Sequence, residues 1–356
     1  MAYLIPPEQL GSLLDGHPTY RSNQLREWLY EHPVLDAADM MNLPLDVRTK
    51  LGTSLWPFTV DAEQVGDAGK TRKWLFRGDK DAAIEAVLMG YTKRVTLCLS
   101  SQAGCAMGCT FCATGQFGFE RQLDAGEIVA QVAYAQAHLQ TYPLPDSPNR
   151  ISNIVFMGMG EPLANYSNVR EALRRMIDVM HIGARHITVS TVGIVPGIRK
   201  LADEPWQVGL ALSLHAADDE LRETLVPINR RYPIGDLIDA CAYYFEKKGR
   251  RVSLEWTMME GTNDTPEQAA KLADIARELR AHVNVINLNP TPLGPDRPSD
   301  MLTVEDFIAD LRSRGVAATF RETRGQDIDA ACGQLRALRF GDVPTEVTIQ
   351  SITKTQ

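Results

Sequence analysis

From Arg94 onward, short apolar runs alternate with longer segments whose apolar residues recur at helical spacing. This alternation predicts β-strands that each lead into a helix. The predicted strands are Val95–Leu99, Ile151–Met157, His186–Thr191, Val208–Leu214, Val252–Met258 and Val283–Leu288, with a possible last strand at Val316–Phe320. The predicted helices are Ala125–Leu139, Val169–Met180, Gly197–Asp203, Ile234–Lys248, Pro266–Leu279 and Val304–Ser313. Six βα repeats predict an α/β fold with a parallel sheet, either a full or partial barrel or an open doubly wound sheet.

The pattern before Arg94 is different. Tyr20–Tyr30 and Ala37–Leu51 have helical spacing, the second interrupted at Pro44, and residues 73–90 predict a two-stranded hairpin. After Asp342 the chain is polar and has no periodicity. We therefore predict a small helical accessory domain over residues 1–65, a main α/β domain over 66–342 and a polar tail over 343–356.

The composition is that of a globular protein, with 44% hydrophobic and 23% charged residues in a chain of 356. The segment Met1–Pro7 lacks the basic and apolar regions of a signal peptide, and no stretch approaches the roughly 18 apolar residues of a membrane span. Six cysteines in a chain of this length favour a reducing cytosol with metal-bound or catalytic thiols. We expect a cytoplasmic protein without a membrane partner.

Three cysteines carry the strongest chemical signal. Cys105, Cys109 and Cys112 have the spacing CxxxCxxC, and the nearest histidine in the sequence is His138. Three thiolates in one loop can hold three irons of a [4Fe–4S] cluster and leave the fourth iron open for a small molecule. A structural zinc site is the alternative, but it usually needs four ligands. The motif resembles that of the radical S-adenosylmethionine (SAM) superfamily, which implies that SAM binds the open iron.

Polar and glycine-rich residues follow the predicted strands at their carboxyl ends. These ends carry Gly158–Pro162, Ser190–Gly193, Ser213–His215 and Asn287–Pro290. In parallel α/β folds, ligands bind at this edge of the sheet. Gly158–Pro162 is also similar to the segment with which radical SAM enzymes hold SAM, although Glu161 in that segment is more often structural. The predicted SAM-binding residues are Gly160, Glu161, Ser190, Ser213, Leu214, His215 and Asn289.

Two longer segments resemble a particular family. Cys98–Cys105 and Thr323–Gln334 are similar to the two cysteine segments of the RlmN/Cfr family of adenine methyltransferases, and the likeness runs from about Lys70 to Leu335. The resemblance implies a partial (βα)6 barrel of the radical SAM type, with the catalytic domain at 66–342. The helices of residues 1–65 are similar to that family's accessory domain, which implies that they help to bind RNA.

The resemblance also implies residue roles. Two SAM molecules would be used: one methylates Cys332, and the other is cleaved to a 5′-deoxyadenosyl radical that removes hydrogen from that methyl group. The resulting carbon radical adds to C2 of adenine, a carbon that does not attack SAM by itself. Glu85 would accept the C2 proton, and Cys98 would release the product by forming a disulfide with Cys332. From the residues alone, Cys98 also fits a buried strand position, Glu85 also fits a half-exposed strand position turned to solvent, and Cys241 fits the core.

The resemblance implies 23S ribosomal RNA as the substrate, tRNA as a further possible substrate, and a flavodoxin- or ferredoxin-like electron donor. We expect a monomer. The net charge of −8 by itself argues against a nucleic-acid partner, because phosphate binding favours a basic face. Phe111, Phe117 and Phe119 either stack on the target base or pack in the core. Two alternatives remain open: methylation of C8 of adenine by the same family, and a non-catalytic iron–sulfur or zinc protein that binds RNA. Basic residues cluster at Lys70/Arg72/Lys73, Lys93/Arg94, Arg170/Arg174/Arg175, Arg230/Arg231, Lys247/Lys248/Arg250/Arg251 and Arg321/Arg324.

Overall fold

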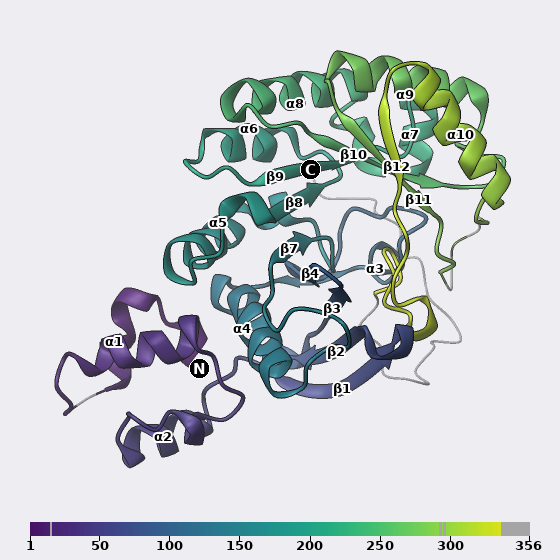
Figure 1. Cartoon of the computed structure of the whole chain (residues 1–356). Coiled ribbons are helices and arrows are strands. Elements are labelled where there is room, and N and C mark those ends of the chain that lie inside the picture. Colours follow the sequence, from purple (N-terminus) through teal and green to yellow (C-terminus); the bar gives the residue numbers. More distant parts are fainter. Residues whose placement is uncertain (15, 292–293, 295–296, 336–356) are drawn as a thin grey trace.

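A computed structural model describes residues 1–14, 16–291, 294 and 297–335. Its main feature is one ten-stranded sheet with the strand order β1-β2-β3-β4-β7-β8-β9-β10-β11-β12. The two edge strands, β1 and β12, do not pair with each other, so the sheet curves without closing (Figure 1). The chain therefore has the α/β fold of a partial barrel, as predicted. The proposed tail, 343–356, lies outside the described residues.

The strands form an antiparallel part and a parallel part. The antiparallel strands are β1 (Thr59–Gly66), β2 (Thr71–Arg77), β3 (Ala83–Tyr91) and β4 (Arg94–Cys98), of which β2 and β3 form the predicted hairpin. From β4 onward all neighbours are parallel, through β7 (Asn153–Phe156), β8 (Ile187–Thr191), β9 (Gly209–Ser213), β10 (Ser253–Met258), β11 (His282–Asn287) and β12 (Ala317–Phe320). Strand β4 and these six are the seven strands predicted from Arg94 onward, and the possible last one is real.

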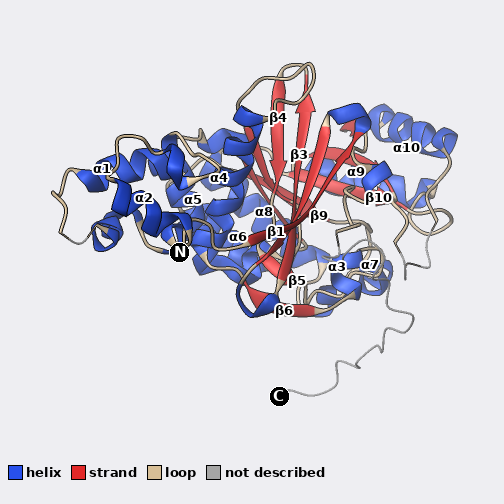
Figure 2. Cartoon of the chain, turned by 90° about the horizontal axis from the view of Figure 1, so that it is seen from below, coloured by secondary structure: helices blue, strands red, loops and turns tan. Residues whose placement is uncertain are grey.

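Helices cover the outer face of the parallel strands (Figures 1 and 2). They are α4 (Ala125–Thr141), α5 (Tyr166–Arg174), α6 (Val195–Asp203), α8 (Ile234–Lys248), α9 (Pro266–Glu278) and α10 (Met301–Ser313). Helix α7 (Asp219–Leu225) lies instead beside α3, and the carbonyl of Leu225 accepts the N–H of Thr110 at 3.1 Å (Figure 2). The six predicted helices are confirmed, with α5 continuing as a π-helical turn over Arg175–Val179. The short α7 has no counterpart in the prediction because its seven residues span only two turns and are mostly polar.

The first 58 residues are helical and irregular, with α1 (Arg21–Arg26) and α2 (Leu45–Gly52) as their α-helices. α2 begins directly after Pro44, where the helical pattern is interrupted. This segment packs on α4: the Tyr3 ring stacks on Trp56 with centroids 5.0 Å apart, and Trp56 meets Tyr134 of α4 edge-on at 5.3 Å. Strand β1, within the predicted accessory domain 1–65, belongs instead to the main sheet. The division of the chain into domains stays a prediction.

Candidate active site

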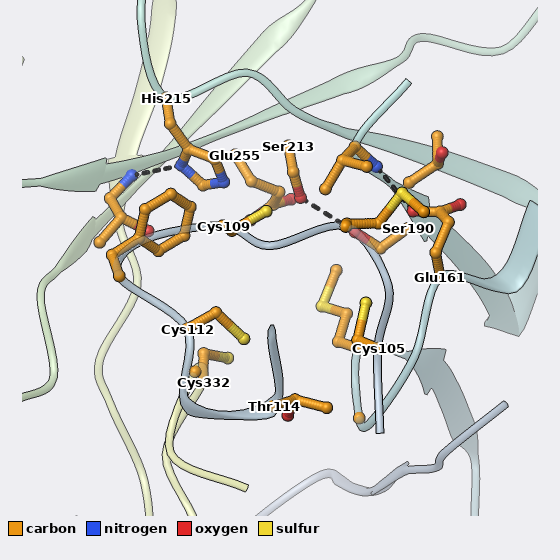
Figure 3. Close-up of a pocket in the computed structure, with 18 of the residues that line it drawn as sticks. Cys105, Cys109, Cys112, Thr114, Glu161, Ser190, Ser213, His215, Glu255 and Cys332 are labelled. Carbon is orange, nitrogen blue, oxygen red and sulfur yellow. Dashed lines mark hydrogen bonds between the residues drawn. The ribbon is translucent and has the colours of Figure 1, made fainter. Parts of the chain in front are cut away.

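The three cysteines lie in the loop between two short strands that follow β4. These strands, β5 (Gln102–Gly104) and β6 (Phe119–Gln122), pair with each other as a small second sheet. Gly104 has φ +68°, and a Cβ atom there would lie 2.0 Å from the carbonyl oxygen of Gly118. The N–H of Cys105 donates to that same oxygen at 2.8 Å, which fixes the start of the loop. Cys112 is the residue before the short helix α3 (Ala113–Gln116). Figure 3 shows the three cysteine side chains arranged around an open space.

The donor set fits an iron–sulfur cluster better than a single metal ion. Among the described residues, no three Cys, His, Asp or Glu side chains converge as the ligands of one ion would. In a cubane cluster each thiolate binds a different iron, so the sulfurs need not converge. Burial raises the pKa of the Cys105 thiol to about 12 and also raises the pKa of Cys109 and Cys112. Thiols this buried need a cation to become thiolates, and the irons of a cluster are such cations.

A cavity of about 150 Å³ opens beside this loop at the carboxyl ends of the parallel strands. It is lined by the three cysteines and by six of the seven residues predicted to bind SAM: Gly160, Glu161, Ser190, Ser213, His215 and Asn289. The exception is Leu214, which lies in the hydrophobic core and donates its N–H to the carbonyl of Glu255. The strand-end rule therefore brings these side chains together, as Figure 3 shows for four of them.

Glu161 has a structural arrangement in this cavity. Its carboxylate accepts the N–H of Leu163 at 3.0 Å and the N–H of Val192 at 2.9 Å, so it joins the loops after β7 and β8. Burial raises the pKa of this carboxyl to about 7. Gly160 beside it has φ +95°, and a Cβ atom there would lie 2.5 Å from Cβ of Gln102. Gly160 therefore packs directly against Gln102, while the Glu161 carboxylate holds the turn in place.

His215 presents a neutral ring to the cavity. Its Nδ1 accepts the N–H of Thr257 at 3.1 Å, so the ring proton of the neutral form is on Nε2. Burial, assisted by the nearby Arg222, lowers the pKa of His215 to about 3. The ring also meets Phe111 edge-on, with centroids 4.6 Å apart. Of the three candidate stacking residues, Phe111 thus packs inside the site.

Ser190 and Ser213 face each other across the ends of β8 and β9, with their hydroxyl oxygens 3.5 Å apart (Figure 3). Asn289 makes different contacts. Its side-chain amide donates to the carbonyl of Cys332 at 3.1 Å and accepts from Gln326 at 2.9 Å. In this structure Asn289 therefore holds the segment that carries Cys332.

Cys332 lies next to the three-cysteine loop, called the cluster loop below, and next to Cys98, although Cys98 and Cys332 are far apart in the sequence. Cys332 lines the main cavity, and together with Cys98 it lines a smaller neighbouring cavity of about 30 Å³. Cys98 is buried at the end of β4, and burial raises the pKa of its thiol to about 12. Two hydrogen bonds hold the Cys332 segment to α3: Ala113 N–H donates to the carbonyl of Gly333 at 2.7 Å, and the Thr114 hydroxyl donates to the carbonyl of Leu335 at 2.6 Å.

All six cysteines, each within the described residues, are free thiols. The disulfide between Cys98 and Cys332 that the resemblance implied is therefore not supported by this structure. Cys241 is fully buried in the core on α8, as its helical spacing predicted.

Glu85 is buried on β3 and forms an ion pair with Lys73, with Nζ and Oε1 3.0 Å apart. Side chains two residues apart on a strand share a face, so Glu85 lies on the same face as Val87. Val87 pairs with Cys98 across the sheet. Lys73 also donates to the carbonyl of Asp329 at 3.1 Å, three residues before Cys332. Glu85 thus lies on the face that carries Cys98 and is joined through Lys73 to the Cys332 segment.

Sequence reasoning missed two charged residues of the site, Glu255 and Arg222, and gave a third, Arg321, only as part of a basic cluster before Cys332. Glu255 and Arg321 both line the main cavity, with Arg321 Nη1 3.7 Å from Glu255 Oε2. Arg222 is fully buried on α7 and donates to the carbonyls of Leu214 at 3.0 Å and Val192 at 2.7 Å, which ties the ends of β8 and β9 together. A glutamate in the middle of the apolar run Val252–Met258 was a usable signal, because a central parallel strand seldom carries a charge.

Comparison with known proteins agrees with this arrangement. Residues 99–273 match the family model of the radical SAM superfamily. A relative from Rhodococcus opacus (strain B4) is 46% identical over 331 residues, which cover 90% of each chain, and one from Heliobacterium modesticaldum is 46% identical over 348 residues, covering 94% of this chain and 89% of the relative. Both are named probable dual-specificity RNA methyltransferase RlmN.

A solved structure gives the same result. The radical SAM methyltransferase from Sphaerobacter thermophilus superposes with a TM-score of 0.89 at 46% identity, covering 94% of this chain and 99% of that one. No helix among the described residues is long and apolar enough to cross a membrane. This chain belongs to the RlmN family of dual-specificity RNA methyltransferases, which are radical SAM enzymes.

Proposed function

We propose that this enzyme methylates C2 of an adenosine in 23S ribosomal RNA, and of an adenosine in tRNA, by way of a methyl group carried on Cys332. The observation that carries this proposal is the position of Cys332. Its segment lies against α3 of the three-cysteine loop, and the exposed Cys332 shares a cavity with the buried thiol of Cys98. A simple methyl transfer from SAM to RNA would need neither thiol.

The cofactors that fit the site are a [4Fe–4S] cluster on Cys105, Cys109 and Cys112, and SAM in the cavity beside it. When bound, they supply a 5′-deoxyadenosyl radical able to remove a hydrogen atom from a methyl group. SAM would contact the backbone of Gly160 and Glu161, the hydroxyls of Ser190 and Ser213, and the ring of His215. The Leu214 side chain lies in the core, so this residue would contact SAM through its backbone only. Asn289 would contact SAM while it holds the Cys332 segment.

The residues then divide the remaining chemistry. The carbon radical on Cys332 bonds to C2 of adenine, and Glu85 takes the proton that leaves C2. The adduct must also give up its one unpaired electron, which the oxidised cluster, when bound, would accept. The Cys98 thiolate attacks the sulfur of Cys332, so a sulfur–sulfur bond forms while the carbon–sulfur bond breaks. The electron pair of that broken bond stays on the carbon, which takes up a proton and becomes the methyl group of the product. The resulting disulfide would be transient: an external dithiol must reduce it before the next cycle, so the free thiols of Cys98 and Cys332 are the state that starts each cycle.

The experiment compares two cysteine variants. Cys332 in protein purified from cells should carry one added methylene unit by peptide mass spectrometry. Cys332→Ala should lose that mark and all RNA methylation. Cys98→Ala should keep the mark and should accumulate a covalent protein–RNA adduct, because nothing releases the product. Cys241→Ala is the matched control, since its thiol is buried in the core away from the site.

Normal turnover by Cys98→Ala, with no adduct, would contradict the proposal. Nucleoside mass spectrometry of the RNA product separates C2 from C8 methylation and shows whether tRNA is modified as well as 23S ribosomal RNA. To identify the electron donor, a flavodoxin and a ferredoxin are added in turn to the methylation reaction, and the amount of methylated RNA is measured. We further propose that the enzyme acts as a cytoplasmic monomer.

A further inference from the structure

The aromatic ring of Tyr91, at the end of β3, is contacted by two guanidinium groups from distant parts of the chain. Cζ of Arg94, at the start of β4, lies 4.4 Å from the ring centroid, and Cζ of Arg324, after β12, lies 5.2 Å from it. We call Tyr91, Arg94 and Arg324 the Tyr91 cluster. It joins the β3–β4 turn to the segment that leads to Cys332.

The positive charge of this cluster is poorly compensated within the described residues. An ion pair joins Arg324 Nη2 to Glu322 at 3.6 Å, and the Glu322 side chain is 78% exposed. The Nε atom of the same Arg324 side chain is buried and has no hydrogen-bond partner among the described residues. Two guanidinium groups thus lie on one ring, and the carboxylate that pairs with Arg324 is exposed to solvent. This arrangement favours the binding of an anion from outside the chain.

Another tyrosine in this protein shows the compensated form of the same arrangement. Tyr243 on α8 is contacted by Arg199 Cζ at 5.4 Å and Lys247 Nζ at 5.3 Å. There, the Tyr243 hydroxyl donates to the carboxylate of Asp203 at 2.7 Å, so a negative charge lies beside the two cations. The Tyr91 cluster differs because the Tyr91 hydroxyl donates to the sulfur of Met89 at 3.9 Å and not to a carboxylate.

The cluster adjoins the reacting thiols. Tyr91 and Arg324 line the cavity that contains Cys98 and Cys332, whereas none of the three cysteines of the cluster loop is among the described residues of that lining. Tyr91 and Arg94 also line a polar cavity of about 500 Å³ inside the partial barrel, which continues to Arg321 and Glu255. A nucleotide whose base reaches Cys332 from this side would bring its phosphate to the Tyr91 cluster.

We propose that the Tyr91 cluster binds the RNA backbone at the target nucleotide, with Arg94 and Arg324 donating to phosphate oxygens and the Tyr91 ring holding the planes of both guanidiniums. This inference rests on the proposed function, because it assumes that the target base reaches Cys332. An acidic electron-donor protein is another polyanion. The position favours RNA, since the cluster adjoins the thiols that meet the base and not the cysteines that hold the irons.

The test uses the full-length holoenzyme and an RNA hairpin that the wild-type enzyme methylates. Binding of Arg94→Gln, Arg324→Gln and the double variant is measured at several salt concentrations. Each single variant removes one charge-assisted hydrogen-bonding group and should bind RNA roughly tenfold more weakly. The double variant should flatten the slope of log affinity against log salt by about 1.4, which is two single-strand phosphate contacts of about 0.7 each. Arg324→Lys should recover part of the affinity, because it keeps the charge but not the fork.

The double variant Arg199→Gln/Lys247→Gln, at the Tyr243 site, is the matched control and should bind RNA like the wild type. Iron content and thermal unfolding show whether each variant is folded. Wild-type RNA affinity and salt slope in Arg94→Gln/Arg324→Gln would overturn the proposal. So would a defect only in the rate of reduction by the electron donor, which would assign the cluster to that partner. If the wild type methylates no RNA, the proposed function fails first and separately.

Discussion

Gly104 is the residue on which the shape of the cysteine loop most depends. Its φ of +68° and its contact with Gly118 leave no room for a side chain, and the next residue is Cys105, which we propose as a ligand of the cluster. A β-carbon at this position has to displace the β5–β6 hairpin, because the atom it meets belongs to the backbone.

We therefore expect Gly104→Ala to lower the iron content and visible absorbance of anaerobically purified protein towards those of the Cys105→Ala/Cys109→Ala/Cys112→Ala variant, which should bind no cluster. Gly235→Ala is the control, because a Cβ atom at Gly235 meets nothing within 4 Å and the residue is in a helix. It should keep its iron and gain about 0.4–1 kcal/mol in unfolding free energy. Full iron content in Gly104→Ala would show that the loop tolerates displacement.

At the scale of elements, a buried histidine of α4 makes polar contacts with two strands of the antiparallel part of the sheet. Nδ1 of His138 accepts from Arg72 of β2 at 2.9 Å, and its Nε2 lies 3.3 Å from the carboxylate of Glu63 of β1. Because arginine only donates, the neutral ring carries its proton on Nε2 and donates it to Glu63. Burial lowers the pKa of His138 below its ordinary value of 6.5, and Arg72 acts in the same direction.

The stability of the protein should depend on pH through this lowered pKa. As the pH falls below 6.5, the unfolded chain takes up a proton at His138 before the folded protein does, so the free energy of unfolding decreases. His138→Gln should therefore lose less stability than the wild type between about pH 6.5 and 5. Urea unfolding across this range measures it, with His186→Gln, at an exposed position, as the control. Identical pH profiles for wild type and His138→Gln would show that His138 contributes nothing to acid sensitivity.

For the whole molecule, the close packing of the N-terminus on α4 decides whether the first 58 residues unfold independently of the rest. A Cβ atom at Gly126 would lie 2.2 Å from the carbonyl oxygen of Tyr3, which also accepts from Arg175 at 3.0 Å. The buried apolar residues of this segment belong to the same core cluster as those of α4 and the sheet. Such shared packing predicts that the two parts unfold together.

Gly126→Ala should accordingly destabilise both parts, by about 1–3 kcal/mol for an overpacked contact. Hydrogen exchange followed by mass spectrometry should show faster exchange in peptides from residues 1–55 and from 125–141 alike. Gly52→Ala, where a Cβ atom meets nothing within 4 Å, should leave both unchanged. Faster exchange confined to residues 1–55 would instead support an independently folding accessory domain.

The sequence by itself determined the elements and most members of the site. Helical spacing and apolar runs identified the parallel strands and their helices. The helices bury one face and expose the other, and the central strands are buried by the helices on one side and the barrel interior on the other. The exposed edge strand β1 lacks such a contrast, and it was missed. The strand-end rule and the cysteine spacing named residues that line one cavity, because parallel strands bring their carboxyl ends to one edge.

The tertiary structure alone decided how these residues are used. It brought Cys98 beside Cys332, assigned the Glu161 carboxylate and Asn289 amide to the chain's own backbone, and brought Glu255, Arg321 and the Tyr91 cluster to the site. These contacts join residues far apart in the chain. Local pattern cannot encode them, since a periodicity tells which face of an element is buried but not what lies against it.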